Sequence, residues 1–207
     1  MTTPPSAPAL DELLGLARRI ADTIGTTLDQ KAYMLDEATR RHQQPGVCWR
    51  VEARTRISDP GDRVLCRWHS GQRTRAVNEL AGEQEALAAR HRMYRSQFLD
   101  VRTLWATRLP LDAHTTFLAH AFRVQAHSGF PVWVTDLDRD VVGDHSDLPS
   151  LVAYPGRCTY LLHHTEQGRP TGATRIDDPK LTTAITDHIE NRARRGESIT
   201  AFTARCL

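Results

Sequence analysis

The sequence has almost no lysine and no long apolar run. Of its 27 basic residues only Lys31 and Lys180 are lysines, and the rest are arginines. No stretch approaches the uninterrupted apolar length of a membrane span. The first ten residues, MTTPPSAPAL, lack the basic start and the apolar core of a signal peptide. We therefore expect a cytoplasmic protein that makes no contact with a membrane.

The chain also lacks the short motifs that identify common enzymes. It contains no Gly-x-Ser-x-Gly, no Walker phosphate loop, no Gly-x-Gly-x-x-Gly and no His-Glu-x-x-His. Its four cysteines are irregularly spaced, which predicts reduced thiols and not a disulfide framework. These absences leave enzymatic activity undecided. Because the motifs that bind common cofactors are among them, we expect no cofactor.

The clearest structural pattern is a strand, a helix and a strand within residues 99–138. A β-branched and aromatic run ends before Pro110, which cannot donate to a sheet ladder. Asp112 is placed to cap a helix, and Gly129 to end it, before a short apolar strand follows. So tight a connection favours a parallel strand pair with a right-handed crossover. The predicted fold class is therefore α/β.

Patterns in the rest of the chain predict a mixed sheet around that unit, with N-terminal helices, two hairpins and a C-terminal helix. The expected elements are helices at about 10–24 and 28–42, the latter with Ala32, Leu35 and Ala38 inward; a hairpin of 47–57 and 64–69; a helix at 74–98 that buries Val77, Leu80, Leu87, Tyr94 and Phe98; a strand at 151–154; a second hairpin of 158–164 and 169–176; and a helix from Asp178 to Gly196. We expect a disordered leader at 1–8, a helical extension at 9–45 and an α/β domain at 46–207. The helical extension fits a cap, a dimerisation hairpin or a degenerate helix-turn-helix.

A basic strand face is the first candidate site. Alternation in the first hairpin predicts a polar face that carries Arg50, Arg54, Arg56, Arg67 and His69. Between residues 40 and 102 there are 13 arginines against seven acidic residues, a net charge of +6. Arginines on one face suit the phosphates of DNA or another anionic partner. The same asymmetry also fits a homodimer interface or the solvated side of a sheet.

An acidic segment at 136–147 is the second candidate. Its aspartates have the spacing of an EF-hand loop, but Val141 stands where that loop needs glycine, so a solvated acidic loop is the better interpretation. The segment follows a strand of the expected parallel pair, where α/β sheets bind ligands. We therefore take Asp136, Asp138 and Asp140, with His163, as a possible ligand site.

Zinc is a third possibility. Cys48, Cys66 and His69 lie on the predicted first hairpin, and His42 would supply a fourth ligand. No Cys-x2-Cys pair is present, and thiols in a core are common. We therefore predict no bound metal, with this group of residues left open.

The order strand, helix, strand, paired short strands and helix, over about residues 75–190, resembles one half of the phospholipase D-like fold. Hydrolases of that family need His-x-Lys-x4-Asp. Here the position two residues before each lysine is an aspartate and not a histidine: Asp29 before Lys31, and Asp178 before Lys180. The resemblance therefore implies a domain without hydrolase activity, similar to those appended to some bacterial transcription regulators.

Two main hypotheses follow, beside the plain possibility of a scaffold whose N-terminal helices and long helix form a protein interface. The first is a non-catalytic regulatory or interaction protein, homodimeric, that binds DNA or an anionic partner through the arginines. The alternative is an enzyme of unfamiliar type that acts on a small molecule or phosphoester at the loop 136–147.

Overall fold

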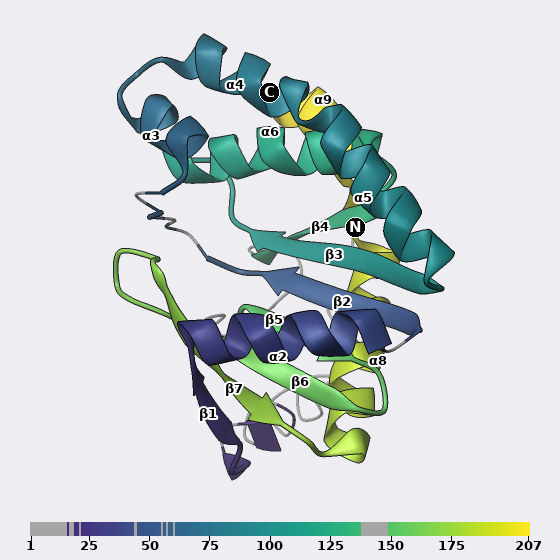
Figure 1. Ribbon diagram of the computed structural model, residues 1–207. Helices are drawn as coiled ribbons and strands as arrows, with labels where there is room; N and C mark the ends of the chain where they lie inside the picture. The colour runs from purple at the N-terminus through teal and green to yellow at the C-terminus, as the bar shows by residue number, and fades with distance from the viewer. Residues whose placement is uncertain are drawn as a thin grey trace, which may run out of the picture.

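The computed structural model describes residues 16, 19, 20, 22–43, 45–54, 56, 58, 59, 61–137 and 149–207. These residues form a mixed α/β fold around an eight-stranded sheet of order β1-β7-β6-β5-β2-β3-β4-β8 (Figure 1). The strands are β1 (Thr26–Asp29), β2 (Gly46–Glu52), β3 (Leu99–Thr107), β4 (Val132–Asp136), β5 (Leu151–Tyr154), β6 (Cys158–His164), β7 (Pro170–Ile176) and β8 (Glu197–Ser198). The helices are α2 (Gln30–Gln43), α3 (Arg63–His69), α4 (Arg73–Gly82), α5 (Gln84–Ser96), α6 (Ala113–His127), α8 (Pro179–Arg195) and α9 (Ile199–Cys206). The predicted α/β class is confirmed.

The predicted strand-helix-strand unit is present as β3, α6 and β4. Strands β2, β3 and β4 are parallel, and the other pairs in the sheet are antiparallel. Asp112 caps α6, because its carboxylate accepts the backbone N–H of Thr115 at 2.8 Å. Gly129 follows the helix with φ +103°, a conformation that favours glycine. Local signals therefore placed this unit correctly.

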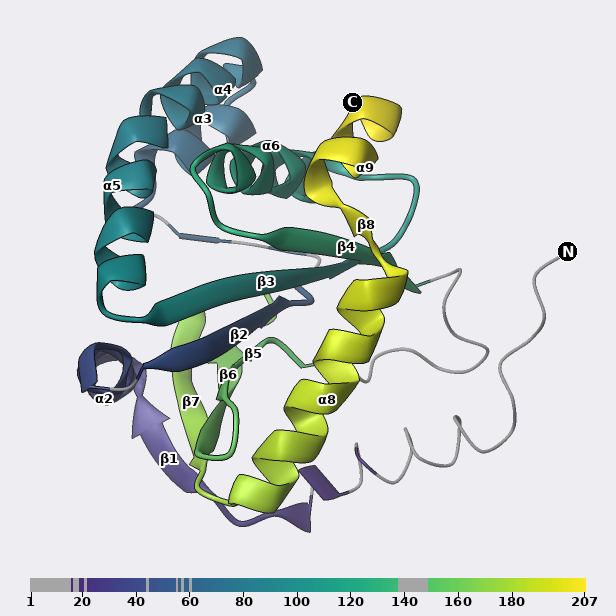
Figure 2. The same cartoon turned by 90° about the vertical axis from the view of Figure 1, so that its right-hand side faces the viewer.

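The two faces of the sheet are covered by different helices (Figure 2). Trp49 of β2 packs with α8, whereas its neighbour Cys48 packs with Tyr94 of α5, because successive side chains of a strand point to opposite faces. On the Cys48 face, Trp105 of β3 contacts Phe122 of α6 with ring centroids 5.5 Å apart. Helices α2, α5 and α6 thus share one face.

The first predicted hairpin is wrong, because residues 63–69 form α3. Asp62 caps this helix by accepting the backbone N–H groups of Val64 and Leu65 at 2.8 and 3.0 Å. Leu65 and Trp68, three residues apart, are both buried, which is a helical and not a strand spacing. Strand β2 finds its partners in β3 and β5 instead.

Three smaller predictions also need correction. The expected helix 74–98 is divided at Glu83 into α4 and α5, and Phe98 is 81% exposed with φ +57°. Helix α2 does not turn Ala32 and Leu35 inward: both are exposed, Leu35 to 70%, and the buried side chain is Glu37. The segment before α2 forms β1, which pairs with β7.

No helix among the described residues is long and apolar enough to cross a membrane.

Candidate functional site

The carboxyl ends of the parallel strands meet at one edge of the sheet. β2, β3 and β4 end there at Glu52, Thr107 and Asp136, and Thr107 is the register partner of Asp136. Because β5 is antiparallel to β2, Ser150 before β5 lies at the same edge. Open α/β sheets bind ligands at this position.

Glu52 and Arg54 bind each other at this edge. Arg54 Nε donates to Glu52 Oε1 at 2.8 Å, and Arg54 Nη2 donates to Glu52 Oε2 at 2.5 Å. Ser150 Oγ donates to the same carboxylate at 3.3 Å, and Arg54 Nη1 donates to the Gly168 carbonyl at 3.4 Å. Burial raises the pKa of a carboxyl group, but the hydrogen bonds and charge of Arg54 outweigh that effect, and the pKa of Glu52 is lowered. Glu52 is therefore a permanent carboxylate that holds Arg54 in place.

Two of the predicted ligand residues, Asp136 and His163, do not come together. His163 is at the end of β6, and its Nε2 atom is 3.0 Å from Thr174 Oγ1. Asp136 ends β4, and β5, β2 and β3 lie between the two strands. Four strand spacings of about 4.8 Å separate them by about 19 Å. Asp138 and Asp140 lie outside the described residues.

The predicted arginine face is also divided among several elements. Arg50, on the same side of β2 as Cys48, opposes part of the burial effect that raises the pKa of Tyr33 to about 12. Arg54 is bound to Glu52, and Arg67 belongs to α3 and pairs with Glu79 of α4. These residues therefore do not form one strand surface.

His69 at the end of α3 and His114 of α6 lie close together, and Arg56 is near enough for its charge to act on His114. The rings of His69 and His114 are 4.7 Å apart between centroids. Burial, the charge of His69 and the charge of Arg56 lower the pKa of His114, whereas Asp112 opposes them. Within the described residues, the buried His114 Nδ1 atom has no hydrogen-bond partner. We call Arg56, His69 and His114 the basic cluster.

Sequence reasoning missed His114. Its position two residues after the N-cap Asp112 was the only available signal, and nothing in the spacing related it to His69, which α3 brings to it. The predicted zinc residues, by contrast, are separated: Cys48 is buried in the core, and Cys66 is exposed on α3. In the part of the chain that the structure describes, no group of three or more His, Cys, Asp or Glu side chains could hold a metal.

The arrangement therefore favours binding of anions over acid-base chemistry. One arginine and two histidines converge where α3 ends and α6 begins, while the carboxylate at the strand ends is neutralised by Arg54. In comparisons with known proteins, the chain matches no protein-family model and no curated protein.

Proposed function

We propose that this chain is a cytoplasmic, non-catalytic regulatory or interaction protein that binds a polyanionic partner. The binding surface is the outer helical layer, defined as α3, α4 and α5, together with the basic cluster. Figures 1 and 2 place α3 and α4 outside α6, on the side of that helix away from the sheet. Helices α3 and α4 are therefore presented to the surroundings, whereas α5 packs on the sheet through Tyr94 and exposes its other side.

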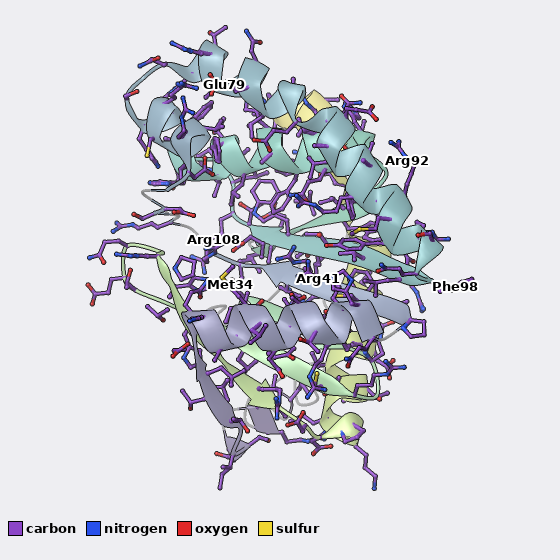
Figure 3. The ribbon with its side chains drawn as sticks, viewed as in Figure 1. Met34, Arg41, Glu79, Arg92, Phe98 and Arg108 are labelled. Atoms are coloured by element: carbon purple, nitrogen blue, oxygen red, sulfur yellow. The ribbon has the colours of Figure 1, made fainter. Side chains whose placement is uncertain are left out.

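The charge of this layer is the observation that carries the proposal. Residues 63–96 contain seven arginines and three glutamates, a net charge of +4, although the whole chain has a net charge of only +2. The seven are Arg63, Arg67, Arg73, Arg75, Arg90, Arg92 and Arg95, and all except Arg67 are exposed. Figure 3 labels Glu79 on α4 and Arg92 on α5 within this layer. An excess of exposed arginines within one segment is the electrostatic footprint of a polyanion-binding protein.

Two further features support a non-catalytic role. Glu52, the carboxylate at the strand ends, is held by Arg54 and Ser150, and its lowered pKa favours the ionised form over the neutral form that a general acid needs. The order of elements behind the resemblance to phospholipase D-like domains runs through β3, α6, β4, β5, β6, β7 and α8. It supports the interpretation of a domain of that kind without its catalytic motif.

The test uses the full chain with two polyanions, heparin and a random-sequence DNA duplex. We expect binding that weakens about a thousandfold between 50 and 200 mM salt if about six phosphates are contacted. Arg56→Glu should weaken binding several-fold. Arg157→Glu, the same charge change in the turn between β5 and β6 at the opposite edge of the sheet, should leave it unchanged. Absence of binding to either polyanion at low salt would refute the proposed function.

A further inference from the structure

Helices α3 and α4 are joined by a turn of only three residues, Ser70, Gly71 and Gln72. Gly71 has φ +85°, which favours glycine at this position. The Gln72 N–H donates to the Arg67 carbonyl at 3.0 Å, and the Gly71 N–H donates to the Trp68 carbonyl at 3.1 Å. These bonds close the end of α3 and fix where α4 starts. A three-residue turn that contains glycine is the kind of connection that joins the two helices of DNA-binding helix-turn-helix units.

The inner side of this pair is anchored on α6. Leu65 and Trp68 of α3 pack with Leu80 of α4 against Phe117. Trp68 Nε1 also donates to the Ala113 carbonyl at 2.7 Å. The pair is therefore a fixed platform, and its outer side is available to a partner.

The outer side of α4 carries side chains that recognise base edges. The exposed residues at its beginning are Gln72, Arg73, Thr74, Arg75 and Asn78. Arginine binds guanine through two hydrogen bonds, asparagine and glutamine bind adenine in the same way, and threonine contacts the thymine methyl group. No acidic residue lies in the first turn of α4, and the Gln72 side chain, which donates to Ser70 Oγ at 3.4 Å, does not cap the backbone N–H groups of that turn. A helix start of this kind suits an anionic acceptor such as a phosphate.

Two contacts hold this set in place. Arg75 Nε donates to Glu79 at 3.4 Å, and Glu79 also pairs with Arg67 of α3. The Arg73 guanidinium lies over the Trp68 ring, 5.3 Å from its centroid. The exposed large apolar side chains among the described residues, which are Ile24, Met34, Leu35, Met93, Phe98 and Leu207, all lie on other elements. A hydrogen-bonding polyanion fits α4 better than an apolar protein surface does.

We propose that α3, the turn 70–72 and α4 form a helix-turn-helix unit that reads double-stranded DNA, with the beginning of α4 in the major groove. The inference rests on the proposed function, because it names the polyanion as duplex DNA. Arg75, Gln72 and Asn78 contact bases, and the basic cluster beside α3 contacts phosphates. Figure 1 shows α4 at the top of the molecule, on the side of α6 away from the sheet.

The experiment selects preferred sequences from a duplex pool with a randomised core, using the full chain, and then measures affinities for the selected duplex. We expect enrichment of one sequence. Arg75→Ala and Asn78→Ala should each weaken binding about 5- to 150-fold and relax the preference at one or two base pairs. Arg90 is exposed on α5, and Arg90→Ala is the matched control. It should leave the sequence preference unchanged, and any loss of affinity should be the same for all duplexes. Circular dichroism verifies that each variant is folded.

The outcomes separate the two proposals. Binding of heparin and duplex without an enriched sequence, or with a sequence preference that Arg75→Ala and Asn78→Ala leave intact, overturns the helix-turn-helix assignment and leaves polyanion binding standing. Equal affinity for single-stranded DNA of the selected sequence also overturns it. Absence of binding to any polyanion refutes both proposals.

Discussion

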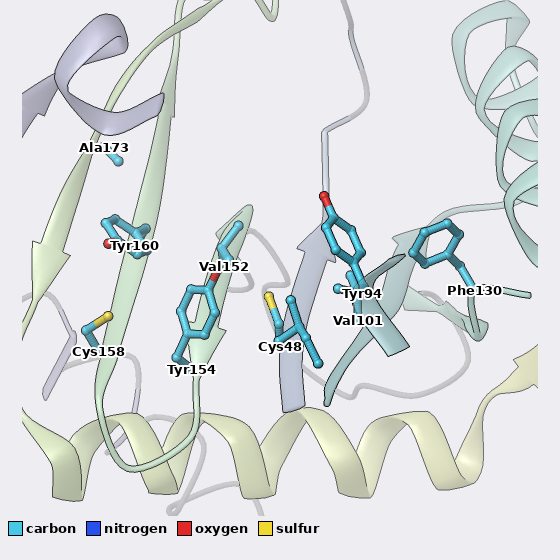
Figure 4. Packing of buried hydrophobic residues seen from close by; sticks show 10 residues of the cluster. Cys48, Tyr94, Val101, Phe130, Val152, Tyr154, Cys158, Tyr160 and Ala173 are labelled. Atoms are coloured by element: carbon cyan, nitrogen blue, oxygen red, sulfur yellow. The ribbon is translucent and has the colours of Figure 1, made fainter. Parts of the chain in front are cut away.

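Tyr154 of β5 donates a hydrogen bond of 2.8 Å to Glu37 Oε1 of α2, in the layer between that helix and the sheet. Glu37 also pairs with Arg41, which donates to Tyr94 Oη of α5 at 2.7 Å. Figure 4 shows Tyr94 and Tyr154 on the same side of the sheet, on either side of Cys48. Helix α2 is therefore attached to the sheet largely through a buried polar network.

Glu37→Ala should lower the free energy of unfolding by about 3 kcal/mol, because it leaves Arg41 partly buried without its carboxylate partner. Urea denaturation measures the change. Glu85→Ala, which removes an exposed carboxylate paired with Arg92, should cost less than about 0.5 kcal/mol. A similar small loss in both variants would contradict the structural role of Glu37.

The attachment of β1 gives a second prediction. A Cβ atom at Gly172, which has φ +144°, would lie 2.1 Å from the Leu28 carbonyl oxygen of β1. Gly172→Ala should therefore displace β1 from β7 and destabilise the protein by at least about 1 kcal/mol. Gly46→Ala is the control, because Gly46 also has a positive φ but no atom within 4 Å of its Cβ position. Thermal unfolding of the two variants separates backbone strain from the clash, and equal losses would rule the clash out.

The sequence predicted the elements that depend on short-range signals. Asp112 marks the start of α6 and Gly129 marks its end, and Asp178 with Pro179 marks the start of α8. These signals are readable in the sequence because caps and proline act within one helical turn. Residues 64–69 misled the prediction, since Val64, Cys66 and Trp68 alternate with Leu65, Arg67 and His69 as the two faces of a strand do. The cap Asp62 and the contact of Trp68 with Phe117 select a helix instead.

The candidate site was less predictable than the fold. Its members come from a loop, the end of α3 and the start of α6, so only the tertiary structure brings Arg56, His69 and His114 together. The orientation of α2 was hidden for a related reason. Glu37 satisfies its buried carboxylate with Tyr154, which lies 117 residues away, and no local pattern reports such a partner.

A third prediction concerns acid. His188 of α8 has its pKa lowered to about 4, first by burial and then by the charges of Arg192 and Arg195. The unfolded chain binds a proton at this residue near pH 6.5 and the folded chain only near pH 4, so stability falls as the pH drops between these values. The loss reaches about 3 kcal/mol.

His188→Leu should remove most of this dependence, whereas His42→Leu, at an exposed position on α2, should retain it. Urea denaturation across that pH range gives the slopes. Equal slopes in wild type and His188→Leu would show that other groups set the acid sensitivity.

The last prediction joins the basic cluster to the proposed function. Burial, His69 and Arg56 keep the pKa of His114 below its ordinary value, so the imidazole is neutral at pH 7 and gains its charge only in acid. A bound polyanion favours the charged form, and lowering the pH below neutral should therefore tighten duplex binding and add up to about one unit to the salt slope. His114→Phe should lose this gain, whereas His127→Phe, at the exposed far end of α6, should keep it. Because both variants share every other titrating group, an equal gain in the two would place the polyanion away from the basic cluster.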